Sequence, residues 1–208
     1  MQVVEVDHKW GGALRKRQAT RKIIIHHAAS AGDVDAATVH RWHLANGWSG
    51  IGYHYLVRMD GTVERGRPED IVGAHAKGHN DDSIGVCLAG NLDLKSPAPA
   101  QMLAVVELVR EIQSRYGDLD LLRHSDVGST ACPGRHFPWE WFCRQFADLP
   151  AVQKQVAVIL DGFLLEQDGY LIDSTSYVPV RLVAEHLGVT VEWHDAAVHM
   201  KRREQKNA

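Results

Sequence analysis

Residues 122–134, LRHSDVGSTACPG, hold two side chains that bind soft metal ions, a histidine and a cysteine. His124 and Cys132 are eight positions apart, and Thr130 lies two positions before the cysteine. Glycine, proline and serine surround them, so the segment is too rich in turn formers to be a helix or strand throughout. We therefore expect a loop to hold this histidine and cysteine.

A third candidate ligand, His26, belongs to the apolar run KIIIHH. Side chains alternate along a strand, so His26 and His27 point to opposite faces and only one can serve a given site. The imidazoles of His26 and His124 and the thiolate of Cys132 suit zinc, and three protein ligands leave a fourth position for water, as in catalytic sites. These three residues do not form a compact His-x-x-x-His motif, so spacing alone leaves open that they are ordinary polar residues. A cysteine hydrolase with Cys132 as nucleophile and His124 as base is a further alternative.

The elements that must position these residues alternate between strand and helix patterns. Strands are predicted from KIIIHH, SIGVCLAG and LDLLRH, and a hairpin from YHYLVRMDGTVERG, which alternates around Asp60 and Gly61. Helices are predicted from DAATVHRWHLANG, capped by Asp35, from SPAPAQMLAVVELVREIQSRYG, ended by Gly117, and from PWEWFCRQFA. This order predicts an α/β fold with a mixed central β-sheet flanked by helices. Three further side chains are expected in the core: Trp42, Cys87 and Cys143.

The pattern changes at ADLPAVQKQ. Residues 1–149 hold every candidate ligand, whereas residues 155–202 show short strands around Asp161 and Gly162, one short helix at 180–187 and a hairpin. About fifty residues fold alone only marginally, so we expect a small α+β accessory domain here. Its VPVRLVAEHLGVTVEW resembles the small domain first named from the amino-terminal part of copper amine oxidases, although no copper-ligand cluster accompanies it.

Composition excludes several classes of protein. The 208 residues carry a formal net charge of −3, which gives no broad attraction to phosphate, so nucleic-acid binding is not expected. No window approaches the ~18 apolar residues of a membrane span, and the basic start lacks the apolar run of a signal peptide. The three cysteines cannot form a disulfide framework. We therefore expect a chain made in the cytoplasm without a signal peptide.

Four motifs follow one another along residues 20–146: IIIHHAAS, RWHLANGWSGIGYHYLVRMDGTVERGR, VGAHAKGHNDDSIGVCLAGN and LLRHSDVGSTACPG. Their order and approximate spacing resemble the zinc N-acetylmuramoyl-L-alanine amidases, the family that includes peptidoglycan recognition proteins. The resemblance places the family's zinc ligands on His26, His124 and Cys132, and its catalytic tyrosine on Tyr53. In addition, Thr130 stands where some members have a lysine, and His75 matches a histidine near the family's cleft.

The resemblance implies a zinc-dependent hydrolase that cleaves the amide between N-acetylmuramic acid and L-alanine in peptidoglycan. Tyr53 and Thr130 would hydrogen-bond the tetrahedral oxyanion. The motifs hold no glutamate of the usual zinc-peptidase kind, so the proton carrier is unassigned, with Tyr53 or His75 acting through water as the options. With no signal peptide expected, the chain resembles a phage or prophage endolysin that reaches the cell wall after release. A non-catalytic peptidoglycan-binding module is the remaining alternative, and the sequence does not set the oligomeric state.

Overall fold

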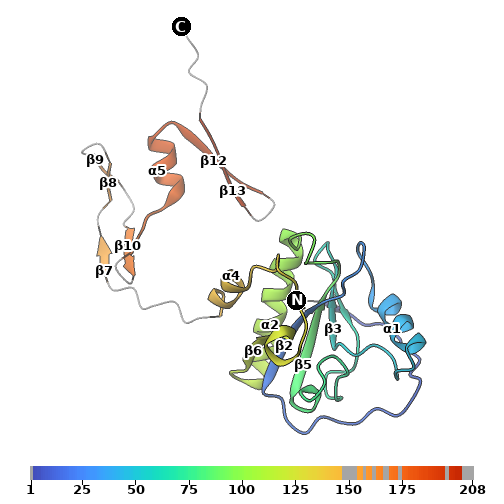
Figure 1. Cartoon of the computed structure of the whole chain (residues 1–208). Coiled ribbons are helices and arrows are strands. Elements are labelled where there is room, and N and C mark those ends of the chain that lie inside the picture. The colour runs from blue at the N-terminus through green and yellow to red at the C-terminus, as the bar shows by residue number, and fades with distance from the viewer. Residues whose placement is uncertain are drawn as a thin grey trace. The chain divides into compact units, whose positions relative to one another are not determined.

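The computed structural model describes residues 2–146, 154–156, 158–160, 163–165, 169–172, 175–194 and 197–202. The chain divides into two compact units, Met1–Phe146 and Ala147–Ala208, whose elements are labelled in Figure 1. The domain boundary expected near Leu149 lies outside the described residues.

A six-stranded sheet forms the centre of the first unit, in the order β1-β4-β3-β5-β2-β6. The β3–β4 pair is an antiparallel hairpin, and the other neighbouring strands of this sheet run parallel. The expected mixed sheet is therefore confirmed. Parallel neighbours end at the same edge, so residues that follow β2 and β6 are brought together. The strands are β1 (Val3–Val4), β2 (Lys22–His27), β3 (Tyr55–Val57), β4 (Val63–Arg65), β5 (Ser83–Leu88) and β6 (Asp120–Arg123).

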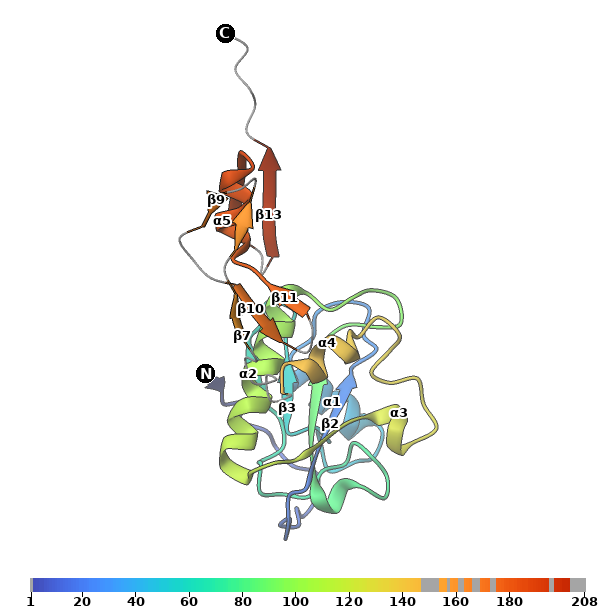
Figure 2. The same ribbon diagram turned by 90° about the vertical axis from the view of Figure 1, so that its left-hand side faces the viewer.

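Helices cover both faces of this sheet (Figures 1 and 2). Helix α1 spans Ala36–Ala45, and its N-cap Asp35 accepts a hydrogen bond from the Thr38 backbone N–H at 2.7 Å. Helix α2 spans Pro99–Tyr116 and ends at Gly117, whose φ of 83° suits glycine. No helix in the described part of the chain combines the length and apolar character that crossing a membrane requires. The shorter helical segments are η1 (Asn80–Asp82), α3 (His124–Val127) and α4 (Trp139–Arg144).

Alternation along the strands divides the core between the two faces. Ile25 of β2 packs in one cluster with Val105 of α2, whereas Cys87 of β5 packs in the other with Val39 of α1. His26 follows Ile25 and is paired in register with Cys87, so its side chain belongs to the α1 face. The candidate ligand on β2 is therefore separated from the α2 cluster by the sheet itself.

Two expectations for the core are wrong. Trp42 is 43% exposed, because α1 turns Val39 and His40 toward the sheet in its place. Cys143 is half-buried, because Phe142 is the residue of α4 that enters the core. Cys87 is buried, as expected.

The described residues of the second unit form small antiparallel sheets and one helix. Strands β11, β10 and β7 form a three-stranded sheet, β8 pairs with β9, and β12 pairs with β13. Ala184 of α5 and Val191 of β12 are buried. The expected short strands, helix and hairpin are present, and the turn at 161–162 lies outside the described residues. The elements are β7 (Lys154–Val156), β8 (Ile159–Leu160), β9 (Phe163–Leu164), β10 (Gly169–Ile172), β11 (Thr175–Tyr177), α5 (Val180–His186), β12 (Val189–His194) and β13 (Ala197–Arg202).

Candidate metal centre

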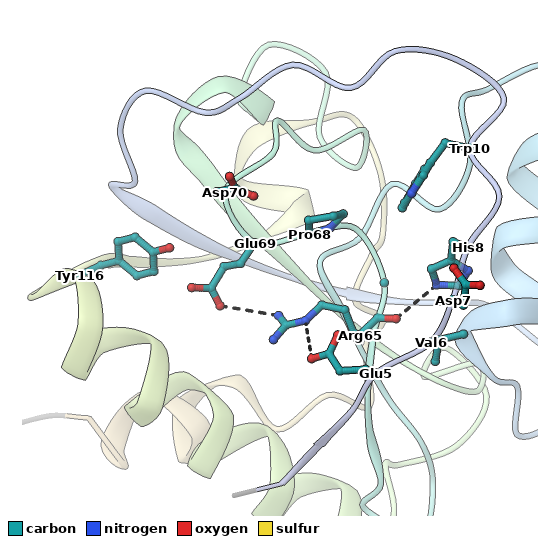
Figure 3. A pocket seen from close by; sticks show the side chains of 11 residues that line it. Glu5, Val6, Asp7, His8, Trp10, Arg65, Pro68, Glu69, Asp70 and Tyr116 are labelled. Carbon is teal, nitrogen blue, oxygen red and sulfur yellow. Dashed lines mark hydrogen bonds and ion pairs between the residues drawn. The ribbon is translucent and has the colours of Figure 1, made fainter.

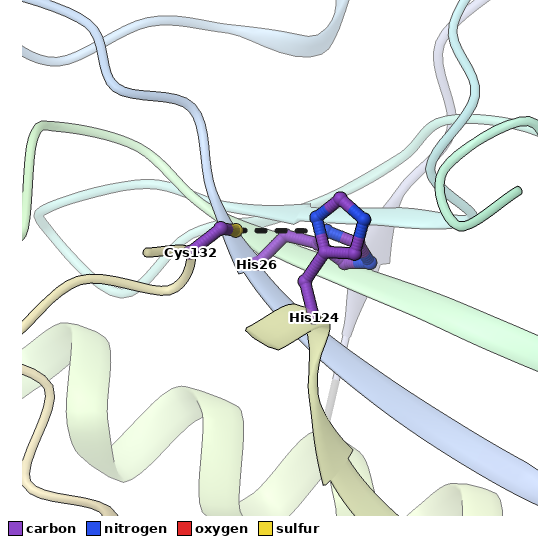
Figure 4. Close-up of side chains that lie close together, drawn as sticks. All are labelled: His26, His124 and Cys132. Carbon is purple, nitrogen blue, oxygen red and sulfur yellow. Dashed lines mark hydrogen bonds between the residues drawn. The ribbon is translucent and has the colours of Figure 1, made fainter. Parts of the chain in front are cut away.

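Three side chains from separate elements meet beside the end of the sheet: His26, His124 and Cys132 (Figure 4). His26 lies near the end of β2, whose parallel neighbour β6 is paired with it up to Ile25 and Arg123. His124 follows directly and opens α3, so the pairing of β2 with β6 brings the two histidines together. Cys132 lies in a loop, as expected, whereas His124 begins a one-turn helix that the sequence did not predict.

The ligand atoms of this cluster lie within 4.8 Å of one another. Sγ of Cys132 is 3.7 Å from Nδ1 of His26, and the ring centroids of His26 and His124 are 4.5 Å apart. Zinc bonds of about 2.3 Å to sulfur and about 2.05 Å to nitrogen, at a tetrahedral angle, separate the two ligand atoms by about 3.6 Å. The spacing of His26 and Cys132 therefore fits a shared zinc ion.

Hydrogen bonds fix the loop that carries Cys132. The Ser125 N–H donates to the Cys132 carbonyl at 2.8 Å, which closes the loop onto the start of α3. The His27 N–H donates to Sγ of Cys132 at 3.4 Å and ties the thiol to β2. Oγ1 of Thr130 accepts from the Cys132 N–H at 3.2 Å. Thr130 is exposed, and a hydroxyl that accepts one bond keeps its own proton to donate.

Burial sets the protonation of the three candidate ligands. It lowers the pKa of His26 well below its usual value, and the neighbouring His124 acts in the same direction. Burial also lowers the pKa of His124 and raises the pKa of Cys132 to about 11. At neutral pH the imidazoles are therefore uncharged and offer lone pairs, whereas the thiol keeps its proton until a metal ion displaces it.

Tyr53 lies beside the cluster, two positions before β3. Its ring centroid is 5.1 Å from that of His26, and its half-buried side chain packs against the core cluster that contains Cys87. Burial raises the pKa of the phenol well above its usual value, and the Cys87 thiol adds to the rise. Tyr53 therefore stays protonated, and its hydroxyl can donate a hydrogen bond beside the three candidate ligands.

His75 lies behind His26, where Nδ1 of His75 is 3.0 Å from Nε2 of His26. Its side chain is buried. His75 also lines a cavity of about 600 Å³ together with His124, Trp48 and Lys77. Because His124 forms part of its wall, this cavity opens next to the three candidate ligands. The exposed Trp48 supplies an aromatic surface there.

A second cavity, of about 440 Å³, is lined by other residues (Figure 3). Within it, Nε of Arg65 is 3.3 Å from a carboxylate oxygen of Glu5, and Nη1 is 3.8 Å from one of Glu69. Nε2 of His8 is 3.2 Å from the Arg65 carbonyl oxygen. Arg65 thus pairs with two carboxylates, while its buried Nη1 has no hydrogen-bond partner among the described residues. None of the proposed site residues lines this cavity, so we place no reaction in it.

The sequence did not identify the residues that surround His75. A Cβ at Gly73 or Gly85 would lie 2.4 or 2.5 Å from atoms of the His75 ring, so both positions need glycine. Oγ of Ser83 is 3.4 Å from Nε2 of His75. The available signal was the glycine in VGAH and in SIGVC, but a glycine in a strand pattern indicates a close approach without naming the partner.

Comparison with known proteins places this site in a family. Residues 16–135 match the family described as N-acetylmuramoyl-L-alanine amidase. The chain belongs to that amidase family. The endolysin of Klebsiella phage KP32 is 43% identical over 125 residues, which cover 57% of this chain and 83% of that protein. Peptidoglycan-recognition protein SC2 of Drosophila melanogaster is 34% identical over 146 residues, with coverage of 61% and 77%. Among solved structures, the N-acetylmuramoyl-L-alanine amidase LysC from Clostridium intestinale URNW has a TM-score of 0.68 and 37% identity, over 70% of this chain and 97% of that one.

Membership of the amidase family confirms the expected enzyme class, and the likeness to LysC confirms the expected fold of the first unit. The matched residues 16–135 include all six site residues, namely His26, Tyr53, His75, His124, Thr130 and Cys132. The second unit lies beyond the match, so the family carries no information about residues 155–202.

Proposed function

We propose that the chain is a zinc-dependent amidase that cleaves the bond between N-acetylmuramic acid and L-alanine in peptidoglycan. The observation that carries the proposal is the convergence of His26, His124 and Cys132 within 4.8 Å, a donor set that suits zinc. Three protein ligands leave a fourth position open. The cavity of about 600 Å³ at His124 gives a substrate access to that position.

Zinc, when bound, polarises a carbonyl oxygen and lowers the pKa of water towards ~7. The chain's own residues hold the amide and stabilise the charge that develops on its oxygen. Tyr53, which burial keeps protonated, donates one hydrogen bond, and the exposed Thr130 hydroxyl supplies a second donor. One donor of this kind typically lowers a barrier by ~3–4 kcal/mol. Water adds across the amide, so the lactyl group leaves as a carboxylate and L-alanine as a free amine.

The alternative of a cysteine hydrolase has less support. Burial raises the pKa of Cys132 to about 11, whereas nucleophilic cysteines have lowered pKa values. The alternative also assigns His124 as the base, yet the ring nitrogen in contact with Sγ is Nδ1 of His26, at 3.7 Å. A non-catalytic binding module is disfavoured by the complete ligand set of two histidines and one cysteine.

Peptidoglycan is the proposed partner and the cell wall the proposed place of action. The phage relatives named endolysin support a phage or prophage enzyme that reaches the wall after release. In the cavity, Trp48 offers an aromatic surface and Lys77 a cation for a carboxylate of the stem peptide. For residues 155–202 we propose an accessory role, in which the module holds the enzyme on the wall and raises its effective concentration.

Digestion of purified sacculi tests this function. Mass spectrometry of the products is expected to show muramic acid with a free lactyl carboxylate and peptides that begin with free L-alanine. Both products should disappear with a chelator and return with added zinc. Cleavage that is indifferent to the chelator would support the cysteine hydrolase, and binding to sacculi without new ends would support the non-catalytic module.

A further inference from the structure

We propose that His75 is a positioning residue that orients His26 toward the metal ion, and that Ser83 in turn orients His75. The inference rests on the proposed zinc function, and it concerns residues that act through His26. A histidine ligand usually donates the N–H of its second ring nitrogen to a partner, which fixes both the tautomer and the ring orientation.

A row of hydrogen-bonding groups leads from the three candidate ligands into the core. Nδ1 of His26 faces Sγ of Cys132 at 3.7 Å, and Nε2 of the same ring is 3.0 Å from Nδ1 of His75. Nε2 of His75 is 3.4 Å from Oγ of Ser83. The Ser83 hydroxyl then donates to the His79 carbonyl oxygen at 2.5 Å. The row therefore ends on an atom that can only accept.

This end point determines where every proton in the row lies. A serine hydroxyl has one proton, and that of Ser83 is held by the nearby His79 carbonyl. Oγ consequently presents a lone pair to His75, which must carry its proton on Nε2 and keep Nδ1 as an acceptor. Nε2 of His26 then donates to that acceptor. Nδ1 of His26 is left with a free lone pair directed at the metal position.

The surroundings of His75 allow its ring little freedom. Gly73 and Gly85 approach so closely that a Cβ on either would lie 2.4 or 2.5 Å from ring atoms. The backbone N–H groups of His75 and Ala76 both donate to Oδ1 of Asn80, at 2.8 and 3.0 Å. The side chain is only 8% exposed, so the ring has little contact with solvent. Ring plane and tautomer are thus set by the fold before any metal binds.

The same contacts argue against His75 as the proton carrier. Both of its ring nitrogens are engaged, one by His26 and the other by Ser83. Neither is free to exchange a proton with a substrate in the cavity. Its contribution to catalysis is therefore expected to act through metal affinity.

The tautomers can be measured directly in the zinc-loaded wild-type protein. Long-range ¹H–¹⁵N correlation spectra distinguish a protonated ring nitrogen from one that carries a lone pair or a metal. We expect His26 and His75 each to be protonated at Nε2 and not at Nδ1. A proton on Nδ1 of His75 would overturn the proposal without any need for a variant.

Substitution tests the effect on metal affinity, measured by competition with a chromogenic chelator. His75→Phe keeps a planar ring but removes the acceptor, and it is expected to weaken zinc binding by roughly 10- to 100-fold. His75→Gln, whose amide oxygen offers an acceptor, should retain more of the affinity than His75→Phe. Ser83→Ala should weaken zinc binding by a smaller factor than His75→Phe.

Two control variants separate positioning from general damage. His40 is also buried and holds two hydrogen bonds, to the Lys9 carbonyl and from the Ile51 N–H, so His40→Phe should destabilise the protein without changing zinc affinity. Ser114 donates to the Glu111 carbonyl on the surface of α2, so Ser114→Ala should have no effect. Folded His75→Phe with wild-type zinc affinity would overturn the proposal. A wild-type protein that neither binds zinc nor cleaves peptidoglycan would instead overturn the proposed function.

Discussion

Lowering the pH is expected to destabilise the first unit through His54, which is fully buried. Its Nδ1 accepts from the Gly85 N–H at 2.9 Å, and its Nε2 is 2.8 Å from the Ile71 carbonyl oxygen. The neutral ring with its proton on Nε2 satisfies both partners. A second proton on Nδ1 would break the bond from Gly85 and place a buried cation 3.1 Å from Nη1 of Arg17.

The size of the effect follows from the pKa of His54. Burial is the main cause that lowers this pKa from 6.5 to about 3. The hydrogen bond to the Ile71 carbonyl raises the pKa, whereas the charge of Arg17 lowers it further. The unfolded chain takes up a proton below pH 6.5, whereas the folded protein resists it down to about pH 3. The contribution of neutral His54 to the free energy of unfolding is therefore complete above pH 6.5. It is lost as the pH falls from 6.5 towards 3. At about pH 5 the loss due to His54 is about 2 kcal/mol.

Urea unfolding of the wild type and of His54→Gln, at about pH 8 and about pH 5, measures this contribution. The variant should be less stable at the higher pH by ~1–3 kcal/mol, because the Gly85 N–H loses its acceptor. The further loss of stability of the variant on acidification should be about 2 kcal/mol smaller than that of the wild type. Zinc release and the other histidines affect both proteins, so the difference isolates His54. The control variant His136→Gln, at an exposed position, should lose as much stability on acidification as the wild type. An equal loss of stability in the wild type and in His54→Gln would refute the reasoning.

Three further predictions concern the catalytic role. Cys132→Ser should lower both zinc content, from about one ion per chain, and hydrolysis; full zinc occupancy in this variant would reject Cys132 as a ligand. Tyr53→Phe should keep zinc and fold, but lose roughly 10²–10³-fold in kcat for a soluble muropeptide, and unchanged turnover would remove Tyr53 from the mechanism. A chain ending at Leu149 should still cleave a small muropeptide, while its binding to sacculi and its lysis of whole walls weaken. Equal loss of both activities, in a truncated protein shown by circular dichroism to be folded, would mean that the second unit completes the active site.

The sequence by itself determined the main elements of the first unit and the identity of its candidate ligands. The run KIIIHH predicts β2 at Lys22–His27, and Gly117 ends α2, because both signals are local properties of the backbone and of β-branched side chains. Imidazole and thiolate are likewise recognisable from residue type alone, so His26, His124 and Cys132 were candidates before any geometry was known.

Only the tertiary structure decided how these residues are used. Register between β2 and β6, which no local pattern specifies, brings His124 to His26. The orientation of a histidine ring depends on partners far along the chain. The glycines near His75 in the sequence and in the fold indicate a close approach, but not that His75 lies against His26, 49 positions away. The exposure of Trp42 could not be predicted from the sequence either, because the packing of α1 against the sheet determines which face of the helix is buried. Residue type determines which chemistry is available, and packing determines which nitrogen, hydroxyl or ring face carries it out.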